Sequence, residues 1–275
     1  MPEASQKLSP TGSDECGELR FHEHVSRIFG NARRLRVWLP PGYSAPQNEG
    51  RRYPVFYLND GQNLFQPETS FAGVDWHVGE TLGRLIRKSV VPPMIVVGID
   101  NATVERIREF LPYKSLYPPV PKPLGKQYPD FLIDEVMPFV ARTYRVARGM
   151  KNTGLGGSSL GALISLHTAI ARPGVFGRLL LESPSLFVSN RQLLKDSRAV
   201  ATWPQRIFVG VGTRESGHVD RDQCIVDDVR ALAHTLHLAG LRDKRLRLLV
   251  EEGATHCEAA WAGRFPEAAA FLFSE

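Results

Sequence analysis

Ser159 lies in a glycine-rich stretch whose composition and spacing favour nucleophilic chemistry. Residues 157–161, GSSLG, match the pattern GxSxG, with Ser159 at its centre. The apolar residues on either side, within 153–171, predict a buried strand followed directly by a helix. A sharp turn between a strand and a helix forces its central serine into a strained conformation that exposes the hydroxyl. We therefore predict Ser159 as the nucleophile, the alternative being an ordinary glycine-rich turn with a capping serine.

A serine nucleophile needs a histidine base, which such strand–helix folds supply from a loop after a later strand. Five histidines follow Ser159, and three of them fall within predicted helices. His256 comes after the apolar stretch 245–251 and before the last predicted helix, where a loop can bring it to the serine. We expect His256 to be the base, with His218 as the alternative.

The acid that orients the imidazole should also follow a strand. Glu215 comes directly after the apolar run 206–212, RIFVGVG, and is our expected acid. A carboxylate on the far imidazole nitrogen fixes the tautomer and stabilises the imidazolium. Asp220 and Asp222, on the same loop, and Glu182, at the end of the preceding strand, remain alternatives.

The oxyanion of an acyl-transfer reaction needs two backbone N–H donors. One is expected from Leu160, the residue after the nucleophile, and the other from a loop after an early strand. That loop is 59–64, NDGQNL, in which Gly61 permits a sharp turn and Gln62 is the candidate donor. The alternative is a simple turn.

The elements that must position these residues alternate along the chain. Two β-rich stretches, 20–28 and 32–39, are separated by Gly30 and Asn31 and predict an antiparallel hairpin at one edge. Short apolar runs that predict buried strands occupy 55–59, 94–100, 152–157, 178–182, 206–212 and 245–251. Helical patterns lie between them at 76–88, 130–144, 160–171, 224–239 and 259–273. The expected fold is α/β: a mostly parallel central sheet with antiparallel N-terminal edge strands and helices on both faces.

The length and composition of the chain are consistent with one large globular domain. We expect a mobile polar tail over residues 1–18 and a single domain over 19–275, with a proline-rich insertion at 112–129 beside the entrance.

The chain is 43% hydrophobic with a net charge of +5, and its basic residues are scattered, which argues against nucleic acid as a partner. No membrane-length apolar run or secretion signal is visible, so cytoplasmic location is the default. Three cysteines without metal-site spacing indicate free thiols, and we expect neither metal nor cofactor.

Several motifs together resemble a known family. The stretches 53–65 (YPVFYLNDGQNLF), 92–101 (PPMIVVGIDN), 154–162 (GLGGSSLGA), 212–216 (GTRES) and 253–256 (GATH) are similar to an esterase family of α/β hydrolases. That family includes enterochelin esterases, feruloyl and acetylxylan esterases, S-formylglutathione hydrolases and mycolyltransferases. The resemblance implies the α/β-hydrolase fold, the triad Ser159, Glu215 and His256, and oxyanion amides at Gln62 and Leu160.

The resemblance also has departures. The early loop lacks the HG-rich form of S-formylglutathione hydrolases, and the second elbow glycine of many relatives is Ala162 here. Five residues near the expected entrance are candidates for substrate binding: Asp60, Asn63, Trp76, Asn101 and Arg108.

We expect a serine carboxylic-ester hydrolase that works through an acyl-enzyme on a small-molecule ester. The positive charge and the aromatic residues near the expected rim suggest an aromatic or siderophore-type ester. An acyltransferase would use the same residues, with an acceptor hydroxyl in place of water. A noncatalytic binding protein that retains the fold is the third possibility.

Overall fold

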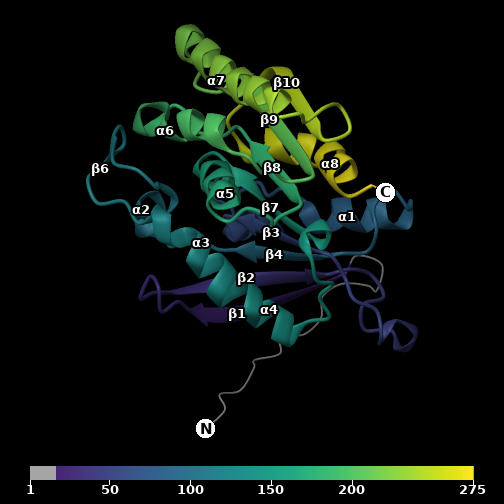
Figure 1. The fold of residues 1–275 in the computed structure, drawn as a ribbon. Coiled ribbons are helices and arrows are strands. Elements are labelled where there is room, and N and C mark those ends of the chain that lie inside the picture. Colours follow the sequence, from purple (N-terminus) through teal and green to yellow (C-terminus); the bar gives the residue numbers. More distant parts are fainter. Residues whose placement is uncertain (1–16, 275) are drawn as a thin grey trace.

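The computed structural model describes residues 17–274, and its centre is one eight-stranded sheet in the order β1-β2-β4-β3-β7-β8-β9-β10 (Figure 1). Strand β2 is antiparallel to both of its neighbours, and the pairs from β4 to β10 are parallel. The strands are β1 (Glu18–Val25), β2 (Ala32–Leu39), β3 (Val55–Asn59), β4 (Ile95–Ile99), β7 (Thr153–Ser158), β8 (Arg178–Glu182), β9 (Arg206–Arg214) and β10 (Leu246–Thr255). The predicted α/β fold, with its antiparallel N-terminal edge, is confirmed.

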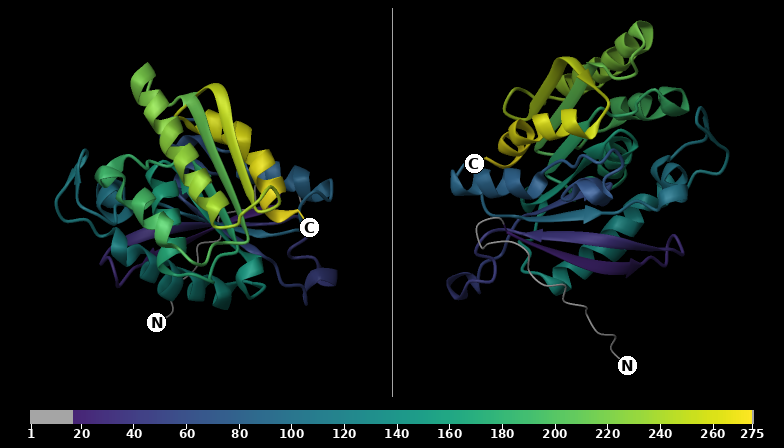
Figure 2. Two further views of the ribbon diagram at one scale, coloured as in Figure 1. Left: turned by 45° about the horizontal axis from the view of Figure 1, so that its top comes forward. Right: turned by 180° about the vertical axis from the view of Figure 1, so that it is seen from behind.

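Helices cover both faces of the sheet. They are α1 (Val78–Arg87), α2 (Arg106–Phe110), α3 (Tyr128–Asp130), α4 (Met137–Thr143), α5 (Leu160–Ala171), α6 (Val188–Asp196), α7 (Val219–Leu238) and α8 (Glu258–Phe273). A π-helical stretch, Phe131–Val136, joins α3 to α4. Helices α1 and α8 lie on one face, and the segment α3–α4 lies with α5 and α7 on the other (Figure 2).

The central strands are buried on both faces, which explains why they are apolar without interruption. On β3, Val55 and Tyr57 enter the core beneath α5, whereas Phe56 and Leu58 enter the core beneath α1 and α8. This alternation follows from the two-residue period of a strand. The central sheet is therefore held between two cores, one on each face.

Most elements lie within two residues of their expected bounds, and β1, α7 and β10 differ by more. Strand β1 begins at Glu18, inside the expected tail, whose residues 1–16 lie outside the described range. Helix α7 begins at Val219, five residues before the predicted start at 224, with two aspartates in a first turn that favours negative charge. Strand β10 runs to Thr255 where a loop was expected, because a bulge after Glu251 lets Thr255 pair with Arg214 of the extended β9.

The proline-rich segment, residues 112–129, extends away from the central sheet (Figure 1). It carries a two-stranded hairpin, β5 (Ser115–Leu116) and β6 (Pro119–Val120), close to α6 (Figure 1). Helices α2 and α6 were not predicted from the sequence, since neither shows a clear apolar period. Among the described residues, no helix combines the length and apolar character that a membrane crossing requires.

Candidate active site

Ser159 occupies the turn between β7 and α5. Strand β7 ends at Ser158 and α5 begins at Leu160, so a single residue makes the turn. Ser159 has φ 57° and ψ −123°, a conformation that costs of order 1–3 kcal/mol and persists only when its surroundings enforce it. A Cβ atom on Gly161 would lie 2.9 Å from Asp60 Oδ2, so glycine is needed there. The glycine-rich stretch thus forms the strained turn expected for 157–161.

The segment after β8 contacts Ser159. The Ser159 N–H donates to the Glu182 carbonyl at 2.8 Å, and the Ser185 N–H donates to the Ser159 carbonyl at 3.3 Å. The hydroxyls of Ser159 and Ser185 are 3.3 Å apart and share a hydrogen bond. Within residues 17–274, no hydrogen bond joins Ser159 Oγ to His256. The nucleophile candidate is therefore paired with a neighbouring serine in this structure.

Glu215 and His256 form a close pair at the ends of β9 and β10. His256 Nδ1 is 2.5 Å from Glu215 Oε2. The His256 side chain is 34% exposed and the Glu215 side chain is fully covered, so the imidazole stands between the buried acid and solvent. Trp261 packs edge-on against the imidazole with ring centroids 5.0 Å apart. With Nδ1 engaged, Nε2 is the nitrogen left to accept a proton.

Hydrogen bonds keep Glu215 ionised despite its burial. Its second oxygen, Oε1, accepts the Gly212 N–H at 2.6 Å and the Ser183 hydroxyl at 2.7 Å. Burial raises the pKa of Glu215, but the hydrogen bonds from His256, Gly212 and Ser183 together outweigh it and lower the pKa overall. A carboxylate held in this way can orient the His256 imidazole and stabilise its protonated form.

The alternative acids have other partners. Glu182 is fully buried and accepts a hydrogen bond from Arg264 Nε at 2.8 Å, and burial raises its pKa to about 7. Asp222 accepts the N–H and hydroxyl of Ser216 at 2.5 and 2.8 Å, on the turn that begins α7. The remaining two alternatives, Asp220 and His218, lie exposed at the start of the same helix.

The loop after β3 makes the sharp turn predicted around Gly61. Asp60 takes a left-handed conformation, φ 57° and ψ 49°, and Gly61–Asn63 make one turn of 3-10 helix. A Cβ atom on Gly61 would lie 2.5 Å from the backbone of Gly98. Among the described residues, the N–H groups of Gln62 and Leu160 donate to no protein acceptor. Both predicted donors are thus unoccupied.

A buried ion pair supports this loop. Arg106 on α2 binds Asp60 with two hydrogen bonds of 2.7 Å, Nε to Oδ1 and Nη2 to Oδ2. Asn101 donates from its side chain to Asp60 Oδ1 at 2.7 Å and from its backbone to Gln62 Oε1 at 3.2 Å. Asp60 and Asn101, predicted near the substrate, therefore lie at the loop and hold its shape.

The other three predicted substrate residues have different surroundings. Asn63 is buried, where it donates to Glu258 Oε1 at 3.2 Å and links the loop to the start of α8. Trp76 is 2% exposed and packs against Trp261 in the core behind the site. Arg108 is half-exposed and pairs with Glu105 at 2.6 Å on α2.

Three residues that support the site were not predicted. Arg106 stands two positions before Arg108, and the sequence showed only a cluster of charges there. Ser183 and Ser185 flank Pro184 directly after β8, a place where parallel sheets present polar residues. Their position at a strand's carboxyl end was the available signal.

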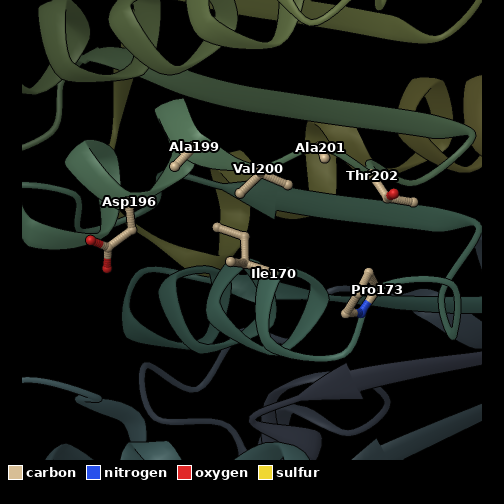
Figure 3. Close-up of a pocket in the computed structure, with 7 residues that line it drawn as sticks. All are labelled: Ile170, Pro173, Asp196, Ala199, Val200, Ala201 and Thr202. Carbon is tan, nitrogen blue, oxygen red and sulfur yellow. The ribbon is translucent and has the colours of Figure 1, made fainter.

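A hollow in the surface lies apart from these residues. It has a volume of about 320 Å³ between the end of α5 and the connection from α6 to β9 (Figure 3). Ile170 and Pro173 line it from the α5 side, and Asp196 and Thr202 from the other. None of the candidate catalytic residues borders it, so we do not place the ester site there.

A mostly parallel eight-stranded sheet, a strained serine between strand and helix, and an acid–histidine pair beyond later strands define an α/β hydrolase. Residues 26–272 match the model of the family described as "Putative esterase". The chain belongs to this family, which confirms the resemblance seen in its sequence. Family and relatives together support an ester hydrolase.

Three relatives illustrate the range of the family. The chain is 23% identical to the uncharacterized protein YbbA of Bacillus subtilis over 88% of its own length and 93% of that protein. It is 26% identical to an endo-1,4-beta-xylanase/feruloyl esterase of Xylanibacter ruminicola over 90% of this chain and 30% of the relative. The enterobactin esterase of Shigella flexneri, crystallised in the presence of enterobactin, superimposes with a TM-score of 0.72 at 21% identity. That match covers 96% of this chain and 59% of the enterobactin esterase.

Proposed function

We propose that this protein is a serine carboxylic-ester hydrolase in which Ser159 is the nucleophile, His256 the base and Glu215 the orienting acid. The 2.5 Å contact between His256 Nδ1 and Glu215 is the observation that carries the proposal. It leaves Nε2 as the acceptor on an imidazole that is partly exposed at the sheet edge. The strained conformation of Ser159 supports the nucleophilic role.

The proposed reaction uses these residues in two stages, acylation and deacylation. Ser159 Oγ rotates from Ser185 towards His256, and His256 Nε2 takes its proton as Oγ attacks the ester carbonyl carbon. The Gln62 and Leu160 N–H groups receive the oxyanion of the tetrahedral intermediate. The C–O bond to the alcohol breaks as His256 returns the proton to the leaving oxygen. Water, activated by the same imidazole, then releases the acid from Ser159.

Two exposed phenylalanines favour an ester with an aromatic acyl group. Phe187 is 43% exposed two residues after Ser185, and Phe71 is 91% exposed and donates its N–H to the Asn63 side chain. Exposed rings offer stacking surfaces to another aromatic group. The feruloyl esterase among the relatives acts, by its name, on esters of an aromatic acid, and we extend that class to this chain as part of the proposal.

Hydrolysis of p-nitrophenyl butyrate, compared between the wild type, Ser159→Ala and Ser158→Ala, tests the proposal. We expect Ser159→Ala to abolish turnover and labelling by a fluorophosphonate, and the neighbouring Ser158→Ala to retain both. Equal labelling of wild type and Ser159→Ala would refute the nucleophile. Adding methanol and analysing the products separates hydrolysis from acyl transfer, which would yield mainly the methyl ester. Methyl ferulate compared with methyl butyrate tests the aromatic preference.

A further inference from the structure

Three side chains of metal-ligand type converge at the start of α1. Asp75, His77 and Glu80 each place one ligand atom within 4.8 Å of the other two. Asp75 is buried, and His77 and Glu80 are exposed. In the spacing D-x-H-x-x-E, Glu80 comes three residues after His77, about one helical turn further along. Its side chain therefore lies on the same side of the helix start as Asp75 and His77. None of the three belongs to the ester site described above.

Asp75 is the unusual member of the group. One carboxylate oxygen, Oδ2, accepts the His77 N–H at 2.9 Å. The other, Oδ1, is shielded from solvent and accepts no well-aligned hydrogen bond in the described part of the chain, although the His77 ring lies within ion-pair distance of it. A buried carboxylate oxygen without a well-aligned hydrogen bond is costly and calls for an explanation. Oδ1 lies on the side of His77, whose ring Nδ1 is 3.2 Å away.

The separation of these two atoms fits a shared ion. Nitrogen and oxygen ligands bind zinc-like cations at about 2.0–2.2 Å, so adjacent ligands at octahedral or tetrahedral angles are about 2.8 to 3.6 Å apart. The observed 3.2 Å lies inside this range. Glu80, exposed on the first turn of α1, can complete a set of one imidazole and two carboxylates.

We propose that Asp75 Oδ1, His77 Nδ1 and the Glu80 carboxylate bind one divalent cation of the manganese–zinc series, with water as the remaining ligands. The mixed nitrogen and oxygen donor set suits these ions better than Ca²⁺ or Mg²⁺, which favour oxygen alone. The ion takes no part in ester cleavage. Binding occurs by replacement of water and needs no redox partner.

The site also connects to the oxyanion loop. The Trp76 N–H donates to the Asn63 carbonyl at 2.9 Å, and the Val78 N–H donates to the Leu64 carbonyl at 3.1 Å. An ion bound by both Asp75 and Glu80 therefore stabilises the backbone of residues 63 and 64, which lie next to Gln62. Its expected effect is to stabilise the protein and fix this loop.

Titration with MnCl2, followed by the electron paramagnetic resonance signal of free Mn²⁺, tests the site in the full chain. We expect the wild type to retain one Mn²⁺ per chain and ZnCl2 to displace it. Asp75→Asn, His77→Ala and Glu80→Gln should each weaken retention at least tenfold. The matched control is His234→Ala, which removes an exposed histidine on α7 and should bind Mn²⁺ like the wild type.

Thermal unfolding supplies an independent readout. ZnCl2 should raise the Tm of the wild type and of His234→Ala, and leave the Tm of His77→Ala unchanged. His77 and Glu80 are exposed, so their variants keep the fold, and circular dichroism verifies this for Asp75→Asn. Two results would contradict the proposal: a wild type that retains no Mn²⁺ at millimolar concentration, and variants that bind Mn²⁺ as the wild type does. Either result would show that Asp75 and His77 only pair with each other.

Discussion

Replacing Glu215 by glutamine should remove most of the activity while preserving the fold. Oε1 of Glu215 accepts two hydrogen bonds, from the Gly212 N–H at 2.6 Å and the Ser183 hydroxyl at 2.7 Å. A glutamine will keep its carbonyl oxygen at this position, because an amide NH2 there would face the Gly212 donor. The NH2 group must then point at His256 Nδ1, 2.5 Å from the present Oε2.

This orientation reverses the hydrogen bond to His256. An amide N–H that donates to Nδ1 requires the imidazole proton to be on Nε2, so Nε2 cannot accept the proton of Ser159. In serine hydrolases whose orienting carboxylate is replaced by the isosteric amide, kcat falls by a factor of about 10⁴. That loss corresponds to about 5 kcal/mol in the activation free energy. Glu215→Gln should therefore reduce kcat by three to four orders of magnitude with little change in KM.

Steady-state hydrolysis of p-nitrophenyl butyrate and the rate of fluorophosphonate labelling both measure the effect. Ser183→Ala is the matched control, because it removes one donor to Oε1 and leaves Gly212 to orient the carboxylate. Its activity should fall by no more than about tenfold, the size of one lost hydrogen bond. A Glu215→Gln protein within tenfold of wild type would refute the assignment and return attention to Glu182 or Asp222.

Further predictions concern stability. Arg106→Ala strips the buried Asp60 carboxylate of its main partner and should lower the free energy of unfolding in urea by about 3 kcal/mol. Burial raises the pKa of Glu182 from 4.5 to about 7, so the folded chain holds a proton that the unfolded chain has released. Stability should accordingly decline by about 3 kcal/mol as pH rises from 4.5 to 7 in urea titrations, and Glu182→Gln should flatten that slope. Gly161→Ala crowds Asp60 Oδ2 and should lower the Tm, whereas Gly263→Ala, which meets no atom within 4 Å, should not.

Most of the fold was predictable because the central strands are buried on both faces. Continuous apolar runs such as 206–212 mark such strands, and the periodic helices between them imply parallel crossovers. The extension of β10 to Thr255 was not predictable, since Glu252, Gly253 and Ala254, which follow the predicted strand, are typical of a loop. The bulge that permits it depends on pairing with Arg214, which is a tertiary contact.

The candidate site was predictable to the extent that strand ends dictate where polar side chains meet. The placement of Glu215 and His256 after neighbouring strands brought them into contact, while their catalytic roles stay predictions. The position of Ser185 after a strand marks it as a polar residue at the sheet edge, but its pairing with the Ser159 hydroxyl is a tertiary contact that the sequence does not reveal. Likewise, Arg106 and Arg108 are indistinguishable in sequence, and only helix geometry selects Arg106 for Asp60.

The short segment Ser183–Pro184–Ser185 connects the residues of the candidate site to one another. Ser183 supports the acid and receives the indole N–H of Trp261, and Ser185 holds the hydroxyl of Ser159. A change of length here would break several of these hydrogen bonds at once, so we expect insertions and deletions in this segment to lower both stability and activity. Variation in substrate range should instead accumulate in outlying connections such as the hairpin of β5 and β6, where sequence drift leaves the catalytic geometry untouched.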